Sequence, residues 1–474
     1  MTRLGALCAL LSLAACRWPA PYVAVEVRAA ALTATASENP ISKLKVTATL
    51  AGVAHTITVP GTPRPLTFPT SFTIEFPADA RGDLDVQIEA LDLTDHVVAT
   101  GHTTGLLSGN GETFVVVELA RWQFVWTGKA VKLADFTSSG TMPITISGET
   151  TLNTDTGAID GIRGAGPGVV DGIGFPGVDA GIWTFSGLTV QPGSILHLTG
   201  ARAAVLLSTG SMQLDGLIDG LNGCKPNTPA PGAFFGGEPG QQGGGPAGGG
   251  GSVLNDQSAG GEGGSCGGVG GMNAGSPQIS LNEKDLGQYL GGSGGGGGFP
   301  NSTGTGTGGR GGAFLHLLAL GSITINGVIN VGGCGGSPGG DGGGGGGGAG
   351  GGLLIEAPTV TLSRSSVLAA NGGGGGGGVE AGESGKPSDQ IAQGGDQTVV
   401  PVSSRKGGWG GAGSLPNGNR AEAHPGFEAG GGGGGVGLIR FNTINADVTA
   451  NGIISPSLGT GFASRGVLVA YPRP

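Results

Sequence analysis

GGGLLIEAPTVTLSRSSVLAA (residues 350–370) is followed directly by NGGGGGGGVEAGESGKPSD (residues 371–389), and the two stretches have opposite characters. In the first stretch, apolar and polar residues alternate, which is typical of half-buried β-strands. The second opens with an unbroken glycine tract that has no side chain to bury. This junction decides the fold, because it recurs elsewhere in the chain.

Strand sequence like that before the junction occurs in four segments. They are VLLSTGSMQLDGLIDGLNG from Val205, HLLALGSITINGVINVGG from His316, LLIEAPTVTLSRSSVLAANG from Leu353 and GLIRFNTINADVTANG from Gly437. Each segment has an apolar strand, a corner and a second, alternating strand. Two apolar positions on one face are equivalent in the four copies: Met212, Ile323, Val360 and Ile444, and then Leu214, Ile325, Leu362 and Ala446.

Units of about 20 residues cannot bury their apolar faces singly, but stacked units can. The sequence therefore predicts an all-β fold in which residues 121–474 form a β-solenoid, most simply a right-handed parallel β-helix. A second β-sandwich with coincidental internal similarity is the alternative. Three copies end at an Asn-Gly pair, which predicts a turn because both residues tolerate positive φ: Asn222-Gly223, Asn371-Gly372 and Asn451-Gly452.

Glycine-rich sequence leaves the predicted coil at the same corner in three copies, after Gly223, Gly333 and Asn371. Ordering the backbone costs about 1–2 kcal/mol per residue, which only backbone hydrogen bonds can offset in a glycine tract. Two states remain open. The inserts are either flexible, like glycine–serine linkers, or extended threefold helices of the polyproline II type that pack side by side as polyglycine II.

Residues 22–120 predict a separate β-sandwich. Seven short stretches with strand character, beginning with YVAVEVRAA at Tyr22, are divided by turn sequences such as PGTPRP and SGNG. This number and spacing of strands suggest an immunoglobulin-like or fibronectin-like domain. The domain contains no cysteine pair, so no antibody-type disulfide is expected.

The first sixteen residues predict an export signal. MTR is a short positive start, LGALCALLSL is an apolar core, and LAAC ends the segment at Cys16. LAAC resembles the bacterial lipobox, which implies cleavage before Cys16 and lipidation of that residue. Arg17 follows Cys16 rather than aspartate, which by family analogy favours the outer membrane. Residues 17–21 are a short tether.

Composition excludes several partners. The chain has 474 residues, 108 of them glycine, and a formal net charge of −10. An acidic chain with few charges is unsuited to binding nucleic acid. The sequence contains no C-x-x-C, H-x-H or H-E-x-x-H motif, so we expect no metal site and no cofactor.

The remaining cysteines predict one disulfide bond. Cys224 and Cys334 follow the same corner in neighbouring repeats. Stacked strands lie about 4.8 Å apart, which is within the Cα separation that a disulfide spans, and export allows oxidation. We therefore expect a Cys224–Cys334 bond, with Cys266 free or paired between chains.

Catalytic motifs are absent or arise by chance. Matches to G-x-S-x-G at Ser293 and Ser337 lie inside glycine tracts and lack the strand–turn–helix context of a nucleophile elbow. Asp-Gly pairs are the only enzyme candidates, because polysaccharide lyases with parallel β-helices use clustered aspartates. They occur at Asp160, Asp171, Asp215 and Asp219, where corner residues are the ordinary interpretation.

The whole chain resembles the glycine-rich surface lipoproteins of large-genome gliding bacteria, often named PE-PGRS-like. The resemblance rests on the lipobox, the short β-sandwich and the repeats with polyglycine inserts. It implies an envelope protein anchored to the outer membrane and exposed at the cell surface, with an adhesive or matrix role. It departs from true PE-PGRS proteins, which have a helical N-terminal domain.

Three functions remain. The first is a non-enzymatic structural or adhesive surface protein that contacts glycans or other cells through Tyr289, Trp409, His424 and Phe427, which lie in the non-glycine parts of the inserts. The second is a scaffold facing the periplasm. The third is a carbohydrate-active β-helix enzyme. The sequence favours the first.

Overall fold

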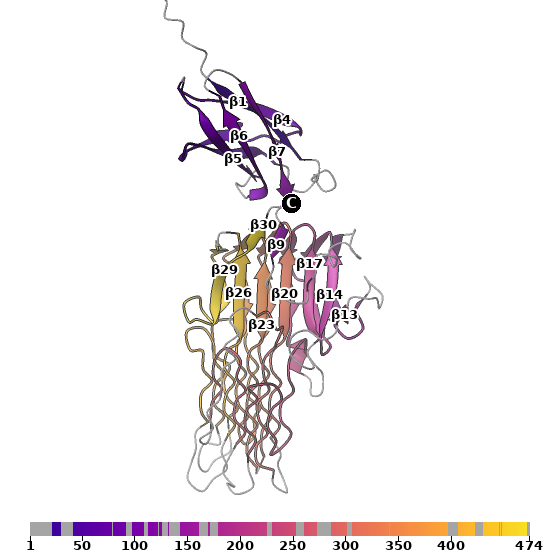
Figure 1. Cartoon of the computed structure of the whole chain (residues 1–474). Helices are drawn as coiled ribbons and strands as arrows, with labels where there is room; N and C mark the ends of the chain where they lie inside the picture. Colours follow the sequence, from indigo (N-terminus) through magenta and orange to yellow (C-terminus); the bar gives the residue numbers. More distant parts are fainter. Residues whose placement is uncertain are drawn as a thin grey trace, which may run out of the picture. The chain divides into compact units, whose positions relative to one another are not determined.

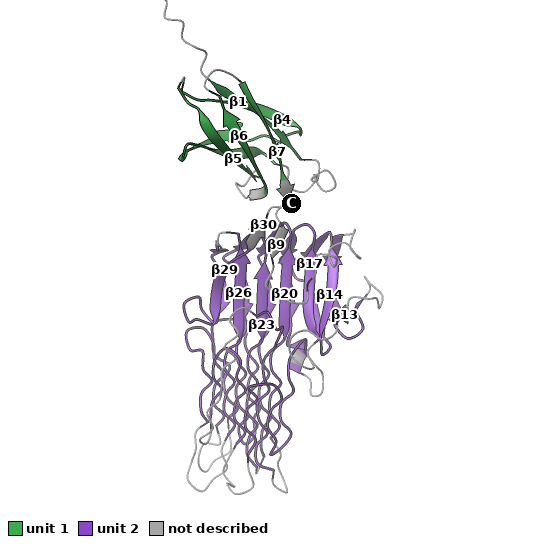
Figure 2. Ribbon diagram, in the orientation of Figure 1, with its two compact units in different colours: residues 1–123, 471–474 green, residues 124–470 purple. Residues whose placement is uncertain are grey.

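A computed structural model describes most of the chain (Figure 1): residues 21–29, 41–77, 79–91, 97–108, 112–121, 123–125, 131, 143–160, 169–170, 179–224, 230–252, 260–272, 286–300, 306–340, 342–396, 406–421, 430–444, 446 and 448–471. Within these residues, helix is limited to a 3₁₀ turn at η3 (Asn222–Cys224), so the predicted all-β class is confirmed. The chain divides into two compact units, residues 1–123 with 471–474 and residues 124–470 (Figure 2). The expected signal segment, with Cys16, lies outside the described residues.

Unit 1 (residues 1–123 with 471–474) contains two sheets. The smaller has the order β4-β1-β7, and the larger has the order β3-β2-β5-β6-β8. The strands are β1 (Tyr22–Arg28), β2 (Lys43–Leu50), β3 (Val53–Val59), β4 (Thr70–Glu75), β5 (Gly82–Leu91), β6 (Val97–Leu107), β7 (Glu112–Glu118) and β8 (Ala120–Arg121). Alternate residues of β1, β2 and β5 are buried in one core between the sheets, as the alternating sequence predicts.

Unit 2 (residues 124–470) contains three long sheets, here called sheets I, II and III. Sheet I consists of β10 (Pro143–Ile146), β15 (Gly187–Val190), β18 (Met212–Leu214), β21 (Ser322–Ile325), β24 (Thr359–Leu362) and β27 (Val448–Ala450). Sheet II consists of β12 (Ala158–Ile159), β11 (Glu149–Asn153), β16 (Ile195–Thr199), β19 (Leu217–Asp219), β22 (Val328–Asn330), β25 (Val367–Ala369) and β28 (Ile453–Ser455).

Sheet III consists of β13 (Val169–Val170), β14 (Ala180–Phe185), β17 (Ala203–Ser208), β20 (Phe314–Ala319), β23 (Gly352–Glu356), β26 (Leu438–Thr443) and β29 (Ala463–Val467). From β14 onward the chain visits sheets III, I and II in the same order on every pass, and successive passes pair in parallel. A further pair, β9 (Gln123–Val125) and β30 (Val469–Tyr471), forms a two-stranded sheet.

The register agrees with the predicted repeat in three copies and differs in the fourth. Met212 pairs with Ile323 and Ile323 with Val360, but Val360 pairs with Val448 rather than with Ile444. Likewise Ala450, not Ala446, continues the row of Leu362. The alignment was wrong because four residues separate β26 from β27, whereas two separate β23 from β24.

The three Asn-Gly pairs are not equivalent. Asn222 has a positive φ of 45°, as a turn residue would. Asn371 is fully buried without a positive φ, and its side-chain amide donates to the Lys386 and Ser388 carbonyls. Asn451 lies between β27 and β28, at a different corner. The predicted common turn was therefore wrong for two of the three pairs.

Glycine-rich segments leave the sheets after β19, β22 and β25 and return at β20, β23 and β26. Figure 1 shows them running on beyond the ends of the strands of sheet III. The described parts of residues 230–312, 331–351 and 370–437 are here called the glycine sheaf. No described helix is long and apolar enough to span a membrane.

Candidate functional site

The central segment of the glycine sheaf, residues 342–351, bonds to its neighbours with a period of three residues. N–H groups three residues apart donate to the same neighbour, with N···O distances of 2.8–3.1 Å. The pairs are Gly343, Gly346 and Ala349 to Phe299, Gly296 and Ser293; Gly345, Gly348 and Gly351 to Ser337, Cys334 and Val331; and Gly347 and Gly350 to Gly432 and Gly435. This period is that of an extended threefold helix.

The carbonyls of the same segment accept from three further segments. The donors are the N–H groups of Gly261 and Gly264, of Gly309 and Gly312, and of Gly373 and Gly376. The segment thus has six hydrogen-bonded neighbours, and consecutive neighbours around it are also bonded to each other, for example Gly295 to Gly309 and Cys334 to Arg310. This is hexagonal packing of extended chains.

The tract after Asn371 is enclosed in the same way. Its N–H groups donate to residues 408–411, 345–348 and 380–383, and its carbonyls accept from residues 333–339, 431–434 and 395. The backbone hydrogen bonds of this tract therefore run to neighbouring segments rather than within the tract. The seven glycines need no side chains, because backbone hydrogen bonds on all sides hold them.

Glycine is required here for space rather than for an unusual backbone angle. None of the glycines at 342–351 or 372–378 has a positive φ. A Cβ atom at Gly345 would collide with the Thr307 carbonyl oxygen, and one at Gly373 would collide with the Cys334 carbonyl oxygen. Any side chain at these positions would push neighbouring segments apart and break their hydrogen bonds.

Outer segments carry side chains at every third residue, and these side chains face solvent. One row is Phe235 and Glu238, which ends at the turn of residues 238–241, and a second is Gln390, Gln393 and Asp396. In the pattern KGGWGG, Trp409 is 39% exposed, whereas the glycines on either side are buried. With about 3.1 Å of rise per residue, side chains in a row are about 9 Å apart. The three-residue spacing was visible in the sequence, but its meaning depended on the packing.

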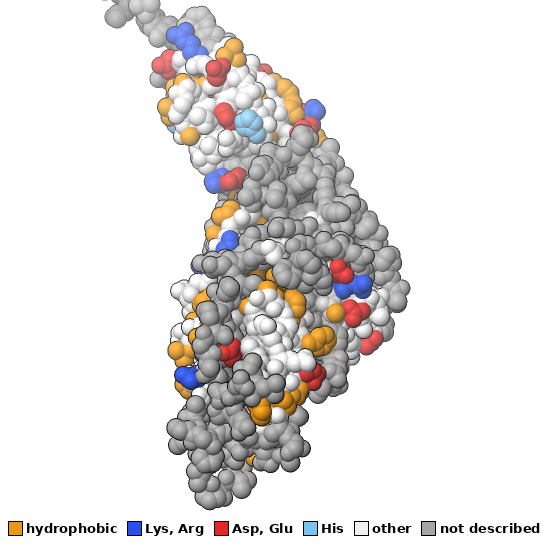
Figure 3. All heavy atoms as spheres, turned by 60° about the horizontal axis from the view of Figure 1, so that its bottom comes forward, with side chains coloured by type: hydrophobic (Ala, Val, Ile, Leu, Met, Phe, Trp, Pro, Cys, Tyr) orange, Lys and Arg blue, Asp and Glu red, His pale blue; other side chains and the backbone are white. Residues whose placement is uncertain are grey.

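These rows interrupt a surface made largely of backbone. Figure 3, turned so that the bottom of Figure 1 comes forward, shows an area of white backbone and uncharged polar atoms among the described residues, with hydrophobic and charged side chains at its border. Trp409 is one of the exposed large hydrophobic side chains of unit 2. Of the two predicted contact residues that lie in the described part of the chain, Tyr289 and Trp409, Trp409 is the exposed one.

Tyr289 does not support the predicted ligand contact, because it is fully buried. Its hydroxyl lies 3.0 Å from His316 Nδ1, and His316 Nε2 lies 2.8 Å from Glu356 Oε2. Asn442 then donates to Glu356 Oε1 at 2.8 Å. The chain of polar groups joins β20, β23 and β26 and ties the first insert to sheet III. His424 and Phe427 lie outside the described residues.

Sequence reasoning missed this buried network. The only sign of the network in the sequence is that His316 and Glu356 lie inside the apolar strands FLHLLA and GLLIE. Both side chains are fully buried, which excludes substrate from the network in this structure. The network contains the residue types of a proton relay, but its hydrogen bonds connect neighbouring strands of sheet III with one another.

A second acid–base cluster lies on sheet II. His197 Nδ1 is 3.0 Å from Asp219 Oδ2, and His197 Nε2 is 3.0 Å from Glu149 Oε1. Asp219 also accepts from the Leu221 N–H. Both ring nitrogens of His197 are thus engaged, and the cluster joins three successive strands, β11, β16 and β19.

Of the other Asp-Gly candidates, Asp215 has a structural role. Asp215 Oδ1 accepts from Gln213 Nε2 at 2.6 Å and from Asn326 Nδ2 at 2.7 Å, which joins neighbouring corners. Asp160 is exposed and directly follows β12, and Asp171 is outside the described residues. The described residues contain no group of three or more His, Cys, Asp or Glu side chains that could hold a metal ion.

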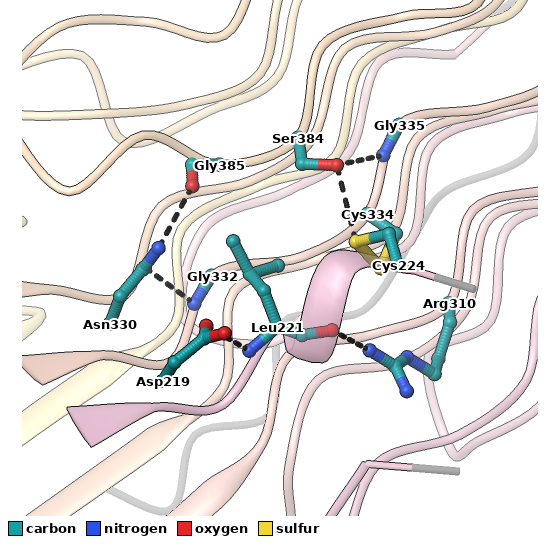
Figure 4. The surroundings of a disulfide bond; sticks show 10 residues. All are labelled: Asp219, Leu221, Cys224, Arg310, Asn330, Gly332, Cys334, Gly335, Ser384 and Gly385. Atoms are coloured by element: carbon teal, nitrogen blue, oxygen red, sulfur yellow. Dashed lines mark hydrogen bonds between the residues drawn. A yellow bond between two sulfur atoms is a disulfide. The ribbon is translucent and has the colours of Figure 1, made fainter. Parts of the chain in front are cut away.

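The structure contains the predicted Cys224–Cys334 disulfide, with a Cα–Cα distance of 5.6 Å (Figure 4). It joins η3 to the glycine segment that follows β22. Ser384, on a third segment, lies 3.1 Å from Cys224 Sγ. Below the bond, Arg310 Nη2 donates to the Leu221 carbonyl at 2.6 Å. Burial lowers the pKa of Arg310 to about 10, although Asp219 opposes this change.

Cys266 is a free thiol buried inside the glycine sheaf. Burial raises its pKa to about 12, against a backbone hydrogen bond from Gly267 that lowers it. Pairing between chains, one of the two predicted states, would require this part of the sheaf to open.

Cys266 should therefore be protected from alkylation. Because burial raises the pKa of the Cys266 thiol, little of it is ionised at pH 8, and the thiolate is the reactive form. We expect no iodoacetamide labelling of Cys266 in the native, unreduced protein, and full labelling in guanidinium. Peptide mass spectrometry measures both, and rapid native labelling would show that the sheaf around Cys266 is open.

Comparisons of the chain with protein-family models, with curated proteins and with solved structures give no match.

Proposed function

We propose that the chain is a non-enzymatic lipoprotein of the bacterial cell surface, with a structural or adhesive role. On this proposal, unit 1 is an immunoglobulin-like spacer near the membrane. Unit 2 is a parallel β-helix whose inserts pack as polyglycine II helices. Cys16 carries the lipid anchor, and the export signal precedes it.

The observation that carries the proposal is the hexagonal hydrogen bonding of the glycine sheaf. A flexible loop that binds a partner loses conformational entropy on binding, whereas a prearranged surface does not. The segment that carries Trp409 and the adjacent row of Gln390, Gln393 and Asp396 form such a surface. Trp409 provides an exposed indole, and glutamine side chains lie on the neighbouring segment, where Gly410 N–H bonds to the Ala392 carbonyl. Aromatic and amide groups together suit a sugar ligand.

The polar clusters support a binding role over catalysis. The Tyr289–His316–Glu356 network is inaccessible, and the His197 cluster uses both ring nitrogens internally. In this structure both ring nitrogens of His316 and of His197 are hydrogen-bonded within the protein, so neither histidine presents a free nitrogen to a substrate. The exposed carboxylate of the His197 cluster, Glu149, is engaged with the His197 ring. The proposed partners are surface glycans or other cells, with no cofactor.

Exposure on intact cells tests the proposed location. Protease is added to cells, and unit 2 is followed with an antibody. We expect loss of unit 2 without lysis, beside a periplasmic control protein that stays whole. Protection of unit 2 until lysis, while a known surface protein is digested, would contradict the surface role and support a periplasmic scaffold.

Replacing Trp409 with alanine tests the proposed contact. We expect purified Trp409→Ala protein to lose at least about tenfold in binding to cells or to a glycan array, since loss of a central aromatic contact costs 1.4 kcal/mol or more. Phe235→Ala is the matched control, because Phe235 is 50% exposed on a segment with no described hydrogen bond to residues 406–411. Equal binding by wild type and Trp409→Ala would remove Trp409 from the site.

A further inference from the structure

Strand β3 (Val53–Val59) is the outermost strand of the larger sheet of unit 1, and it is open on both faces. Six of its seven residues are exposed. Val53 is 58% exposed and Ile57 is 38% exposed, although both have strong β-forming side chains. No residue of β3 belongs to the core described for unit 1.

The exposed apolar side chains of β3 lie on the inward face of its sheet. Ile57 pairs with Val46 and His55 with Ala48, and both β2 residues are buried. Directly paired residues share a face, so Val53, His55, Ile57 and Val59 point to the core side. The facing sheet has three strands against five, and no described strand covers β3. The inward face of β3 therefore extends beyond the strands of the smaller sheet.

The free edge of β3 lacks the usual protection against pairing. Its sequence, VAHTITV, has no lysine, arginine, acidic residue, proline or glycine. Natural edge strands commonly carry such residues or are covered by another element. The backbone groups of β3 that point away from β2 have no described hydrogen-bond partner.

We propose that β3 is a self-association surface that pairs antiparallel with β3 of a second copy. A two-fold axis at Thr56 would place Val53 opposite Val59 of the partner subunit, and His55 opposite Ile57 of the partner subunit. No like charges meet in this arrangement, and every contact is made twice, so the interface closes as a dimer. Because β3 has no Lys, Arg, Asp or Glu side chain that could attract a charged strand of another protein, a second copy of β3 is the favoured partner.

The interface is small, so the dimer should depend on concentration. A pair of seven-residue strands buries less than the roughly 1,200 Å² of a standard interface, and we expect a dissociation constant on the order of 10–100 µM. On a membrane, anchoring would raise the local concentration. That last step rests on the proposed function, whereas the pairing in solution does not.

Sedimentation velocity of the full chain carrying Cys16→Ser, which removes the expected lipid site, measures the association. We expect monomer at about 1 µM and dimer at about 200 µM. Ile57→Lys should weaken the dimer at least tenfold, because it places two charges in the interface. Leu106→Lys is the matched control, since Leu106 is 67% exposed on β6, and should leave the dimer unchanged.

Cysteine crosslinking tests the register. Thr56→Cys should form an intermolecular disulfide, because the two-fold axis sets position 56 against itself. Thr73→Cys, exposed on β4, should not. A monomer at all concentrations, a dimer that Ile57→Lys leaves unchanged, or equal crosslinking at both sites would each overturn the proposal. These results are independent of cell-surface exposure, so the pairing can fail while the proposed function stands.

Discussion

Gly345→Ala is expected to destabilise unit 2 by about 3 kcal/mol or more. Gly345 lies in the central segment of the sheaf, where its N–H donates to Ser337 and its carbonyl accepts from Gly376. An added Cβ would collide with the Thr307 carbonyl. Overpacking costs about 1–3 kcal/mol, and each buried hydrogen bond that is broken adds about 1–3 kcal/mol. Denaturant unfolding followed by circular dichroism measures the loss.

The matched control is Gly187→Ala, on strand β15 of the same unit. A Cβ there would meet its nearest atoms at 3.7 Å, which is an ordinary contact, and Gly187 has no positive φ. We expect unchanged or slightly higher stability, because alanine restricts the unfolded chain more than glycine does. Equal stability of Gly345→Ala and Gly187→Ala would mean that the central segment is not packed as described.

Removing the Cys224–Cys334 disulfide is expected to cost about 5 kcal/mol. The bond closes a loop with a sequence separation of 110 residues, and the chain-entropy argument assigns about that value to a loop of this size. The double variant Cys224→Ser/Cys334→Ser should show the loss in denaturant unfolding without reductant.

Reduction of the wild-type protein should give the same loss. Cys266→Ala keeps the Cys224–Cys334 bond and is the control, so without reductant it should unfold at a denaturant concentration similar to that of the wild type. If the double variant unfolds at the wild-type midpoint, the bond does not restrain the unfolded chain of unit 2.

The repeating parallel strands of unit 2 could be predicted from the sequence because its inward positions repeat at constant spacing. Met212, Ile323 and Val360 fill one row in both the alignment and the structure. The prediction failed at Ile444, where a longer corner shifts the register, since spacing alone does not reveal a lengthened corner. The disulfide could be predicted from the same repeat, because Cys224 and Cys334 come after neighbouring strands of sheet II.

The state of the glycine tracts could not be predicted from one tract alone. The backbone of residues 371–378 is satisfied by segments as distant in sequence as 333–339 and 431–434. Whether hydrogen bonds offset the ordering cost therefore depends on how many segments leave the same corner and lie side by side. Tyr289 was misjudged for a related reason: an isolated aromatic in a polar insert gives no sign that it packs against Phe314 and His316.

Amide hydrogen exchange of residues 342–351 tests the packed sheaf most directly. If six neighbouring segments hold this segment, its amides should exchange at least about a thousandfold more slowly than in the unfolded chain, which corresponds to an opening free energy of about 4 kcal/mol. Mass spectrometry of the peptide that contains Gly343–Gly351 measures the rate in native and in denatured protein. Exchange at the rate of the unfolded chain would contradict the packed sheaf and leave the glycine tracts as flexible loops.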